Sequence, residues 1–418
     1  SRAVLDINRV LALAGKPYQA RLSLADYLDA SRSPVKSSDL LKAAETPHNN
    51  PFYSYFAPRL CQLLAESPQY IGFSMNFLSQ ALCTMAMAGF IKKIHPRQKI
   101  ILGGSLATSF VKVAGRTNLF PGLMDEVVSG AGEAKLLDLL GVENPLSGPS
   151  ADYRLLEENH YLSAGFVLPY ATALGCWWRK CAFCPETAES NPYRPLPPSV
   201  VIEELAALGL RNKPSLIHLL DNSLAPSFMQ ELTRNPPGVP WYGFARITHH
   251  LADQDFCRAL KKSGCVMLKL GIESGDQTVL DALNKGMDLS IASQALHALK
   301  KAGIAVYGYF LFGTPPENVD SAQKTMDFIC RHSEALTFLN LAIFNLPVTS
   351  REAAHLRTED FYEGDLSLYK NFRHPQNWNR SQVRHFVERS LKKHSAIAPI
   401  VRRTPDLFTS NHAPFFCF

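Results

Sequence analysis

Short apolar runs alternate with longer helix-like stretches in the first third of the chain. The apolar runs 69–75 and 99–105 flank a helix-like stretch at 79–96, and the second run closes on two glycines. A third apolar run, 126–128, leads through a glycine-bearing turn into a helix-like stretch with Glu133 in its first turn. Strands that alternate with helices predict a parallel, doubly wound (Rossmann-like) α/β sheet, in which ligands lie beyond the carboxyl ends of the strands.

The alternation resumes after residues 143–153, where Pro, Gly and Ser are concentrated and predict a linker. Six strands separated by helix-like stretches predict a partial (β/α)6 barrel, similar to a TIM barrel, with its chemistry at the carboxyl ends of the strands. From about residue 348 the pattern is less regular. We therefore predict three parts, 1–147, 148–347 and a small C-terminal extension, 348–418. The six predicted strands are 166–176, 215–223, 241–248, 265–274, 304–313 and 335–346.

Two other stretches bear on the class of protein. Residues 3–7 read as a strand already in progress at the start of the sequence, which predicts a processed or truncated amino terminus. The run 71–91 carries no charge and is long enough to span a membrane, but polar residues interrupt it, among them Ser74 and Asn76. A buried strand followed by a buried helix is the favoured interpretation, and no membrane span is expected.

Charge and cysteine content narrow the class further. The 418 residues are 46% hydrophobic and 19% charged, and 43 Lys and Arg against 37 Asp and Glu give a net charge of +6. This excess is too mild and too evenly spread to predict a nucleic-acid or membrane surface. The nine cysteines are odd in number and only one group is clustered. We expect a reducing, cytoplasmic compartment and one thiol ligand site.

The clustered cysteines are Cys176, Cys181 and Cys184, in the stretch CWWRKCAFC directly after the first predicted barrel strand. A disulfide would leave one thiol over, and zinc prefers a fourth ligand that no downstream CxxC or HxxxH motif supplies. His249 and His250 are adjacent, and on a strand they would point to opposite faces. A four-iron cluster held by three thiolates keeps one iron open, so it suits this number of cysteines best.

The cysteine loop and the strand ends downstream of it resemble the radical S-adenosylmethionine (radical SAM) enzymes. The resemblance implies that the three cysteines hold a 4Fe-4S cluster, although this chain has four residues between the first two cysteines where the family commonly has three. It also implies contacts with S-adenosylmethionine from several elements; for Asn222, a helix cap or turn stays an equal alternative. The implied contact residues are Phe183 and Gly313 at the adenine, Asp221 and Asn222 at the methionine end, Arg246 at the carboxylate, and Glu273 and Ser274 at the ribose or amino group.

The first part of the chain resembles the cobalamin-binding domain that precedes the barrel in one large subclass of these enzymes. The absence of a DxHxxG motif implies that no histidine from that motif ligates the cobalt. A domain that keeps the fold and has lost the cofactor is the alternative. The residues that the resemblance places around the cobalamin tail are Ser74, Met75, Leu78, Gly103, Gly104, Ser105, Gly130, Gly132 and Glu133.

Together these resemblances imply a cobalamin-dependent radical SAM methyltransferase that forms a 5′-deoxyadenosyl radical and methylates an unactivated carbon. Rearrangement or cyclisation with the same cofactors is the first alternative. RNA methylthiotransferases carry a second cysteine triad, where this chain has only Cys61 and Cys83, and a cluster-bearing sensor would not need the cofactor-shaped strand ends.

The expected partners are a small-molecule or peptide substrate and an electron donor such as flavodoxin or ferredoxin, without nucleic acid. The aromatic residues near the carboxyl terminus could belong to a core or line a substrate pocket, and core is the favoured interpretation. They are Phe361, Tyr362, Tyr369, Phe372, Trp378, Phe415 and Phe416.

Overall fold

The computed structural model describes residues 2–142, 152–153, 163, 165–361, 363–404 and 412–417. The chain forms two compact units. Unit 1 comprises Ser1–Gly148, Leu346–Thr349 and Arg357–Phe372, and unit 2 comprises Pro149–Asn345, Ser350–Leu356 and Arg373–Phe418. Among the described helices, none is long and apolar enough to cross a membrane.

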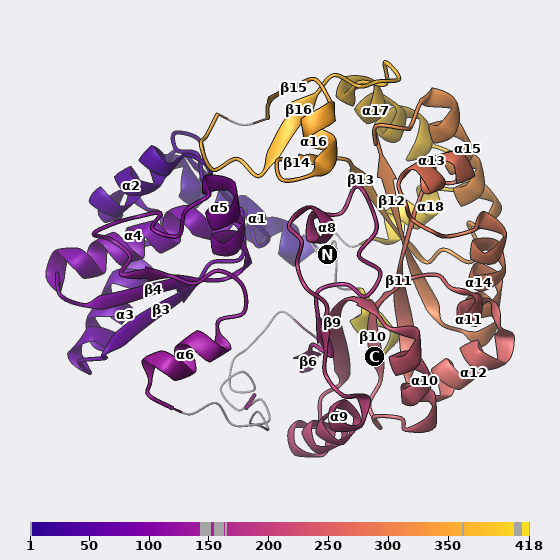
Figure 1. Cartoon of the computed structure of the whole chain (residues 1–418), viewed down its shortest axis with the longest axis horizontal. Coiled ribbons are helices and arrows are strands. Elements are labelled where there is room, and N and C mark those ends of the chain that lie inside the picture. Colours follow the sequence, from indigo (N-terminus) through magenta and orange to yellow (C-terminus); the bar gives the residue numbers. More distant parts are fainter. Residues whose placement is uncertain are drawn as a thin grey trace. The chain divides into compact units, whose positions relative to one another are not determined.

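Unit 2 is built on one parallel sheet whose six strands follow each other in chain order (Figure 1). Each strand is connected to the next through helical segments, as in a partial (β/α) barrel. All six predicted barrel strands are present, so the predicted fold of this region is confirmed. The strands are β6 (Val167–Tyr170), β9 (Leu216–Leu224), β10 (Trp241–Ala245), β11 (Cys265–Glu273), β12 (Ala305–Phe312) and β13 (Phe338–Ile343).

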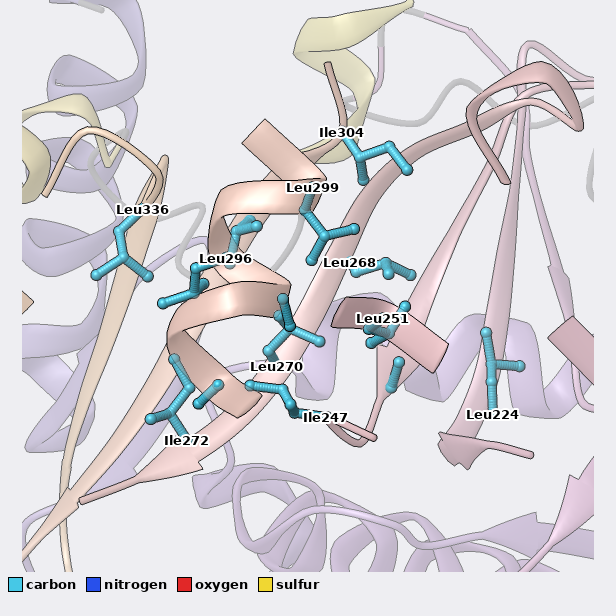
Figure 2. Close-up of a cluster of buried hydrophobic side chains, with 14 of the residues drawn as sticks. Leu224, Ile247, Leu251, Leu268, Leu270, Ile272, Leu296, Leu299, Ile304 and Leu336 are labelled. Atoms are coloured by element: carbon cyan, nitrogen blue, oxygen red, sulfur yellow. The ribbon is translucent and has the colours of Figure 1, made fainter. Parts of the chain in front are cut away.

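Helices cover one face of this sheet. In Figure 2, Leu268, Leu270 and Ile272 of β11 point toward Leu296 and Leu299 of α14. Alternate residues of a strand point to opposite faces, so the odd-numbered residues of β11 face the barrel interior. The longer helices of unit 2 are α9 (Pro198–Asn212), α10 (Pro226–Arg234), α12 (Gln254–Lys262), α14 (Leu289–Ala302) and α15 (Val319–Arg331).

Several of these helices begin at a side chain that accepts hydrogen bonds from the first turn. The Asp253 carboxylate caps α12 and Asp288 caps α14, while the Asn318 amide oxygen caps α15. Such caps satisfy backbone donors that the helix itself cannot pair. His249 and His250 lie on α11 (His249–Ala252), a short helix and not a strand. These caps therefore fix the residues at which α12, α14 and α15 begin.

Unit 1 contains a parallel sheet of three strands in the order β3-β4-β5, connected by helices. The apolar run at 71–91 forms the end of a strand and a buried helix, as expected, and the Rossmann-like α/β pattern is confirmed for this region. The elements are β3 (Tyr70–Ser74), α4 (Leu78–Ile94), β4 (Lys99–Gly103), α5 (Ser105–Ala114), β5 (Glu126–Val127) and α6 (Glu133–Leu139).

The predicted strand at residues 3–7 is wrong. Those residues lie in α1 (Arg2–Gly15), a 14-residue helix. The short window hid a longer stretch rich in Leu, Ala and Arg, which favour helix, and Gly15 ends it. The Cβ that a larger residue would add at Gly15 would lie 2.3 Å from the Ala20 carbonyl oxygen, so this close turn requires glycine. The elements between α1 and β3 are η1 (Lys16–Tyr18), β1 (Ala20–Leu22), β2 (Tyr27–Asp29), α2 (Ser37–Glu45), η2 (Pro47–Asn49) and α3 (Tyr53–Ala65).

Part of the predicted C-terminal extension returns to unit 1. The Leu366 amide donates to the Val35 carbonyl at 2.9 Å, and the Leu366 side chain joins the core of that unit. The strands β14 (Leu346–Pro347), β15 (Thr358–Asp360) and β16 (Tyr369–Phe372) form a small antiparallel sheet.

The aromatic residues near the carboxyl terminus divide between surface and interior. Trp378 is buried in the core of unit 2, whereas Phe415 and Phe416 are 59% and 42% exposed. Phe361 and Tyr369 contact each other edge to face, and Phe372 ends β16. Tyr362 lies outside the described residues.

Candidate functional site

The cysteine loop of unit 2 lies between β7 (Ala173–Leu174) and α8 (Pro185–Ala188), after the first barrel strand. All nine cysteines of the chain, including the three in this loop, are free thiols. Within the described residues, no three Cys, His, Asp or Glu side chains converge as a single metal ion requires. A four-iron cluster makes no such demand, because its cysteine ligands bind different irons.

The charges around the three thiols suit a set of thiolate ligands. Burial raises the pKa of Cys181, and the cations Lys285 and Arg246 act in the opposite direction. Burial also raises the pKa of Cys184, to about 11, so both thiols hold their protons at neutral pH without metal. Binding to iron would release these protons, since thiolate is the ligating form. The two neighbouring cations would then offset the negative charge of the thiolates.

Two tryptophans anchor the cysteine loop. The Trp177 indole N–H donates to Ser223 Oγ at 3.1 Å and to the Leu224 carbonyl at 3.2 Å, at the end of β9. The Trp178 indole N–H donates to the Asn284 carbonyl at 3.1 Å. Arg179 between them and Cys181 has a left-handed φ of 52°. Arg179 therefore forms a tight turn between the two tryptophans and Cys181.

Trp178 also packs closely against two other segments of unit 2. The Arg246 guanidinium carbon lies 3.9 Å from the centre of the Trp178 ring, a cation–π distance. A Cβ at Gly286 would lie 2.2 Å from that ring, so only glycine leaves room for the indole. Asn284 and Gly286 are both in left-handed conformation, with φ of 52° and 58°. The turn between α13 (Gln277–Ala282) and α14 is therefore shaped around Trp178.

Arg246 is the predicted residue whose surroundings fit a ligand most directly. It follows β10, is 6% exposed, and lies close enough to Cys181 for the two side chains to influence each other's pKa. Its Nη2 atom is buried without a hydrogen-bond partner among the described residues. A buried guanidinium nitrogen normally has a partner. Arg246 can therefore offer this nitrogen to a carboxylate beside the cysteine loop.

Glu273 and Lys285 form a buried ion pair at the end of β11. Lys285 Nζ lies 2.8 Å from Glu273 Oε1, with side chains 8% and 12% exposed. Glu273 has a left-handed φ of 68°, and a Cβ at Gly271 would lie 2.5 Å from its Oε1 atom. Lys285 Nζ also lies 5.6 Å from the Phe183 ring of the cysteine loop. The structure therefore brings Phe183, Glu273 and the cysteine loop together.

Other predicted contact residues are held by the protein itself. Both carboxylate oxygens of Asp221 accept hydrogen bonds from Thr172, one from its amide at 3.0 Å and one from its hydroxyl at 2.5 Å. Ser274 Oγ lies 3.2 Å from Thr325 Oγ1. Asn222, by contrast, is exposed at the end of β9. Asp221 and Ser274 therefore stabilise the strand ends in this structure, whereas the exposed Asn222 side chain has no hydrogen bond to another described residue.

Gly313 follows β12 in left-handed conformation, with φ of 77°. Its amide donates to Glu317 Oε2, which also accepts from the Trp378 indole N–H at 3.2 Å. Burial raises the pKa of Glu317 to about 8. The two hydrogen bonds lower the pKa, but their effect is smaller than that of burial. Glu317 is thus a buried neutral acid at pH 7 that fixes the loop after Gly313.

The predicted cobalamin residues of unit 1 also lie together, at the carboxyl ends of β3, β4 and β5. The Ser105 backbone N–H donates to Asn76 Oδ1 at 2.9 Å, and the Asn76 side-chain amide Nδ2 donates to Ser74 Oγ at 3.1 Å. Gly104 has φ of 104°, and a Cβ there would lie 2.5 Å from the carbonyl oxygen of the buried Met75. This close approach brings the ends of β3 and β4 together.

The glycines at these strand ends leave open space. A Cβ at Gly103 or Gly130 would meet nothing within 4 Å. The Gly130 amide donates to Thr108 Oγ1 at 2.9 Å, which fixes its turn. Gly132 precedes α6 and Glu133 is exposed in its first turn, while Leu78 begins α4. Backbone with open space in front of it fits an extended ligand tail.

Residues 170–329 match the Radical SAM superfamily model, a segment that runs from the end of β6 to α15. Residues 170–329 form a radical SAM domain. The predicted family is therefore confirmed for the barrel, on the segment that carries the cysteine loop and the strand ends described above.

Solved structures with this radical SAM domain extend the likeness to most of the chain. The radical SAM methyltransferase TsrM from Kitasatospora setae, solved with cobalamin and a 4Fe-4S cluster bound, has a TM-score of 0.56 at 16% identity and covers 84% of this chain and 83% of that chain. The cobalamin-dependent radical enzyme OxsB, solved with aqua-cobalamin and S-adenosylmethionine, has a TM-score of 0.54 at 18% identity and covers 67% of this chain and 46% of that chain. At these identities the likeness shows the fold.

Curated relatives match over shorter segments. The anaerobic magnesium-protoporphyrin IX monomethyl ester cyclase of Rubrivivax gelatinosus is 27% identical over 159 residues, which cover 37% of this chain and 28% of the relative. The bacteriochlorophyllide d C-12(1)-methyltransferase of Chlorobaculum tepidum is 28% identical over 186 residues, 42% of this chain and 40% of the relative. The chain thus spans less than half the length of these relatives.

Sequence reasoning missed several residues that shape the radical SAM site. Thr172, Lys285 and Gly286 lie far from their partners in the sequence, so no local pattern marks them. Lys285 and Gly286 do stand beside each other in the stretch LNKG, which a turn before a helix commonly contains. The role of Trp178 is visible only from its neighbours in the structure. An exposed loop tryptophan and one that anchors a loop cannot be distinguished by sequence alone.

Proposed function

We propose that this protein is a cobalamin-dependent radical SAM enzyme that transfers a methyl group to an unactivated carbon. The observation that carries the proposal is the pairing of a three-thiol loop, flanked by Arg246 and Lys285, with a second α/β unit whose strand ends leave open space at Gly103 and Gly130. The likeness of most of the chain to the fold of TsrM supports both halves.

Cys176, Cys181 and Cys184 would hold a 4Fe-4S cluster, and the cobalamin residues named above would hold the corrinoid. When bound, these groups supply one electron for cleavage of S-adenosylmethionine to methionine and a 5′-deoxyadenosyl radical, and the methyl group for transfer. An electron donor such as flavodoxin or ferredoxin would supply the electron. The free thiols of all nine cysteines support a reducing, cytoplasmic compartment.

The protein's own residues would orient S-adenosylmethionine. Arg246 can pair its free Nη2 atom with the methionine carboxylate, and its guanidinium geometry suits a carboxylate better than an ammonium would. The Glu273–Lys285 ion pair keeps the Glu273 carboxylate in place for a ribose hydroxyl or the amino group. Phe183 offers a ring face to the adenine, and the left-handed Gly313 lets the backbone approach it closely. These contacts would hold the cofactor in one reactive geometry.

Methyl loading of cobalamin tests this proposal without knowledge of the substrate. The protein is reconstituted anaerobically with iron, sulfide and cobalamin, and a chemical reductant converts the cobalt to Co(I). It is then mixed with S-adenosylmethionine that carries an isotopic label on its methyl group. We expect label in the cobalamin fraction. If cobalamin is retained and no label reaches it, methyl transfer by this route is excluded.

Cyclisation without net methylation is the second candidate. It is favoured by the similarity to the Rubrivivax gelatinosus cyclase over 159 residues. Product mass separates the two reactions once a substrate is found, because methylation adds carbon and hydrogen whereas cyclisation adds no carbon. A product without the labelled methyl group would support cyclisation.

A further inference from the structure

The interior of the barrel in unit 2 contains a buried lysine that the S-adenosylmethionine site does not use. Lys269 lies in the middle of β11 and is 3% exposed. Its chain neighbours Leu268 and Leu270 point into the helix layer (Figure 2), so the Lys269 side chain points to the barrel interior. Glu273 lies on the same face, four residues or about 13 Å further along the strand.

Aromatic rings and imidazoles surround this lysine. Its Nζ atom lies 5.2 Å from the centre of the Tyr242 ring and 4.9 Å from that of Phe244. The His218 ring stacks on Tyr242 with a centroid distance of 4.3 Å and an interplanar angle of 8°. None of the ion pairs found among the described residues includes Lys269. The ammonium is therefore held by ring faces and has no carboxylate partner.

His412 is a second buried polar group for which the described part of the chain supplies no hydrogen-bond partner. It is fully buried, and neither of its ring nitrogens has a hydrogen-bond partner among the described residues. Its ring lies 4.9 Å from Tyr307 and 4.3 Å from Phe338, both on the interior face of their strands. Tyr307 is the register partner of Lys269 between β11 and β12, which places His412 and Lys269 in the same region of the barrel.

The charge balance of this region favours an anion. Burial lowers the pKa of Lys269 to about 8, so it keeps its charge at pH 7. The pKa values of His218 and His412 are lowered to about 4, mainly by burial and to a smaller extent by the charge of Lys269. Both imidazoles are therefore neutral at pH 7. A buried cation without a counter-ion is costly, and an acidic ligand would remove that cost.

Strand β9 has exposed residues on its interior face above this region. On β9, Leu220 and Asn222 lie on the same face as His218, and Leu220 is 48% exposed. An exposed leucine on the interior face means that the barrel is not filled by side chains at this level. A ligand would enter the barrel from this exposed level, at the end of the sheet where the cysteine loop lies.

We propose that Lys269 binds an acidic group of the substrate, a carboxylate or a phosphate, inside the barrel, with His218 and His412 as neutral hydrogen-bonding neighbours. This deepens the proposed function, on which it rests for the statement that the ligand is the substrate. Because Lys269 lies deeper in the barrel than Glu273, the acidic group would anchor the far end of the substrate and leave its reacting carbon near the strand ends. The substrate is then an organic acid or a phosphorylated compound.

Anion-dependent thermal stability tests this site, with inorganic phosphate and acetate as the probes. Tm of the anaerobically reconstituted protein is measured in each anion against chloride at equal ionic strength. At ten times the dissociation constant we expect Tm to rise by about 3–6 °C. A rise with only one of the two anions identifies the phosphate or the carboxylate as the group that the site takes.

Matched variants decide whether the effect belongs to Lys269. Lys269→Met, which keeps the length of the side chain, should lose the rise, and Lys269→Arg, which keeps the charge, should retain it. Lys301→Met removes an exposed lysine from the end of α14 and should behave as the wild type. An equal rise in Lys269→Met, or no rise in the wild type with either anion, would overturn the proposal.

The outcome is separable from that of the proposed function. An anion response with no formation of 5′-deoxyadenosine would keep the anion site and reject radical chemistry. Formation of 5′-deoxyadenosine without an anion response would reject the anion site and keep the radical chemistry.

Discussion

Gly286 is the position where a single methyl group should disturb the cysteine loop most specifically. Its added Cβ would lie 2.2 Å from the Trp178 ring and 3.3 Å from Arg246 Nη2. Trp178 lies between the first two cysteines of the loop, and Arg246 lies beside the second of them. We expect Gly286→Ala to displace the indole and, with it, the loop that holds the thiols.

The magnitude follows from two contributions. An L-residue at the left-handed φ of 58° costs about 1–2 kcal/mol relative to glycine. The steric overlap with Trp178 costs about 1–3 kcal/mol more, as for other residues forced into a packed site. Gly303→Ala provides a matched control, because Gly303 has φ of 71° and its nearest contact is Lys261 Cε at 4.0 Å. Gly303→Ala should therefore be destabilised by the backbone conformation alone, without steric overlap.

Thermal unfolding and iron content together measure the effect. We expect Tm of Gly286→Ala to lie about 2–12 °C below that of Gly303→Ala, at ~2–4 °C per kcal/mol. Iron bound per chain after reconstitution should fall in Gly286→Ala and not in Gly303→Ala. In a Trp178→Ala background the difference between the two alanine variants should vanish, because the overlap is gone. Equal Tm and equal iron content for the two single variants would refute the reasoning.

Three other substitutions test further parts of the two units. Lys285→Met leaves the buried Glu273 carboxylate without its cation, so we expect the free energy of unfolding in urea to fall by about 3–5 kcal/mol; a loss below ~1 kcal/mol would contradict a stabilising pair. Burial raises the pKa of Glu317 from 4.5 to about 8, so this group stabilises the fold fully below pH 4.5 and its contribution is lost as pH rises through 8. Glu317→Gln should flatten the fall in Tm between pH 4.5 and 8, and an unchanged pH profile would argue against it. In unit 1, Gly104→Ala should lower Tm more than Gly115→Ala, because its Cβ would lie 2.5 Å from backbone whereas that of Gly115 meets nothing within 4 Å, and equal Tm values would contradict this.

The barrel could be predicted because its signals are local. Each of its strands is a short apolar run with a polar or glycine end, and residues such as Arg246 and Glu273 mark those ends. The cysteine loop could be predicted because its three cysteines resemble the motif of the radical SAM family. The first helix was missed because a window at 3–7 is too short to separate a period of 3.6 from a continuous apolar run.

The detailed site depended on contacts between residues distant in sequence. Trp178 contacts Gly286 about a hundred positions later, and Thr172 occupies both oxygens of Asp221. Nothing in the local sequence shows that the Asp221 carboxylate is already engaged. Lys269 carried a weak signal, as a charged residue within an apolar strand, but its unpaired state becomes visible only when the neighbouring strands are in place.

The central claim is that three cysteines of this chain hold a cluster that cleaves S-adenosylmethionine. The most direct measurement is 5′-deoxyadenosine formation by the anaerobically reconstituted protein, with iron content determined in parallel. The wild type and a Cys61→Ala control, which alters an exposed thiol in unit 1, should bind iron and release 5′-deoxyadenosine. The variant with Cys176, Cys181 and Cys184 all changed to alanine should do neither; if it retained the cluster and formed 5′-deoxyadenosine, the account would be contradicted.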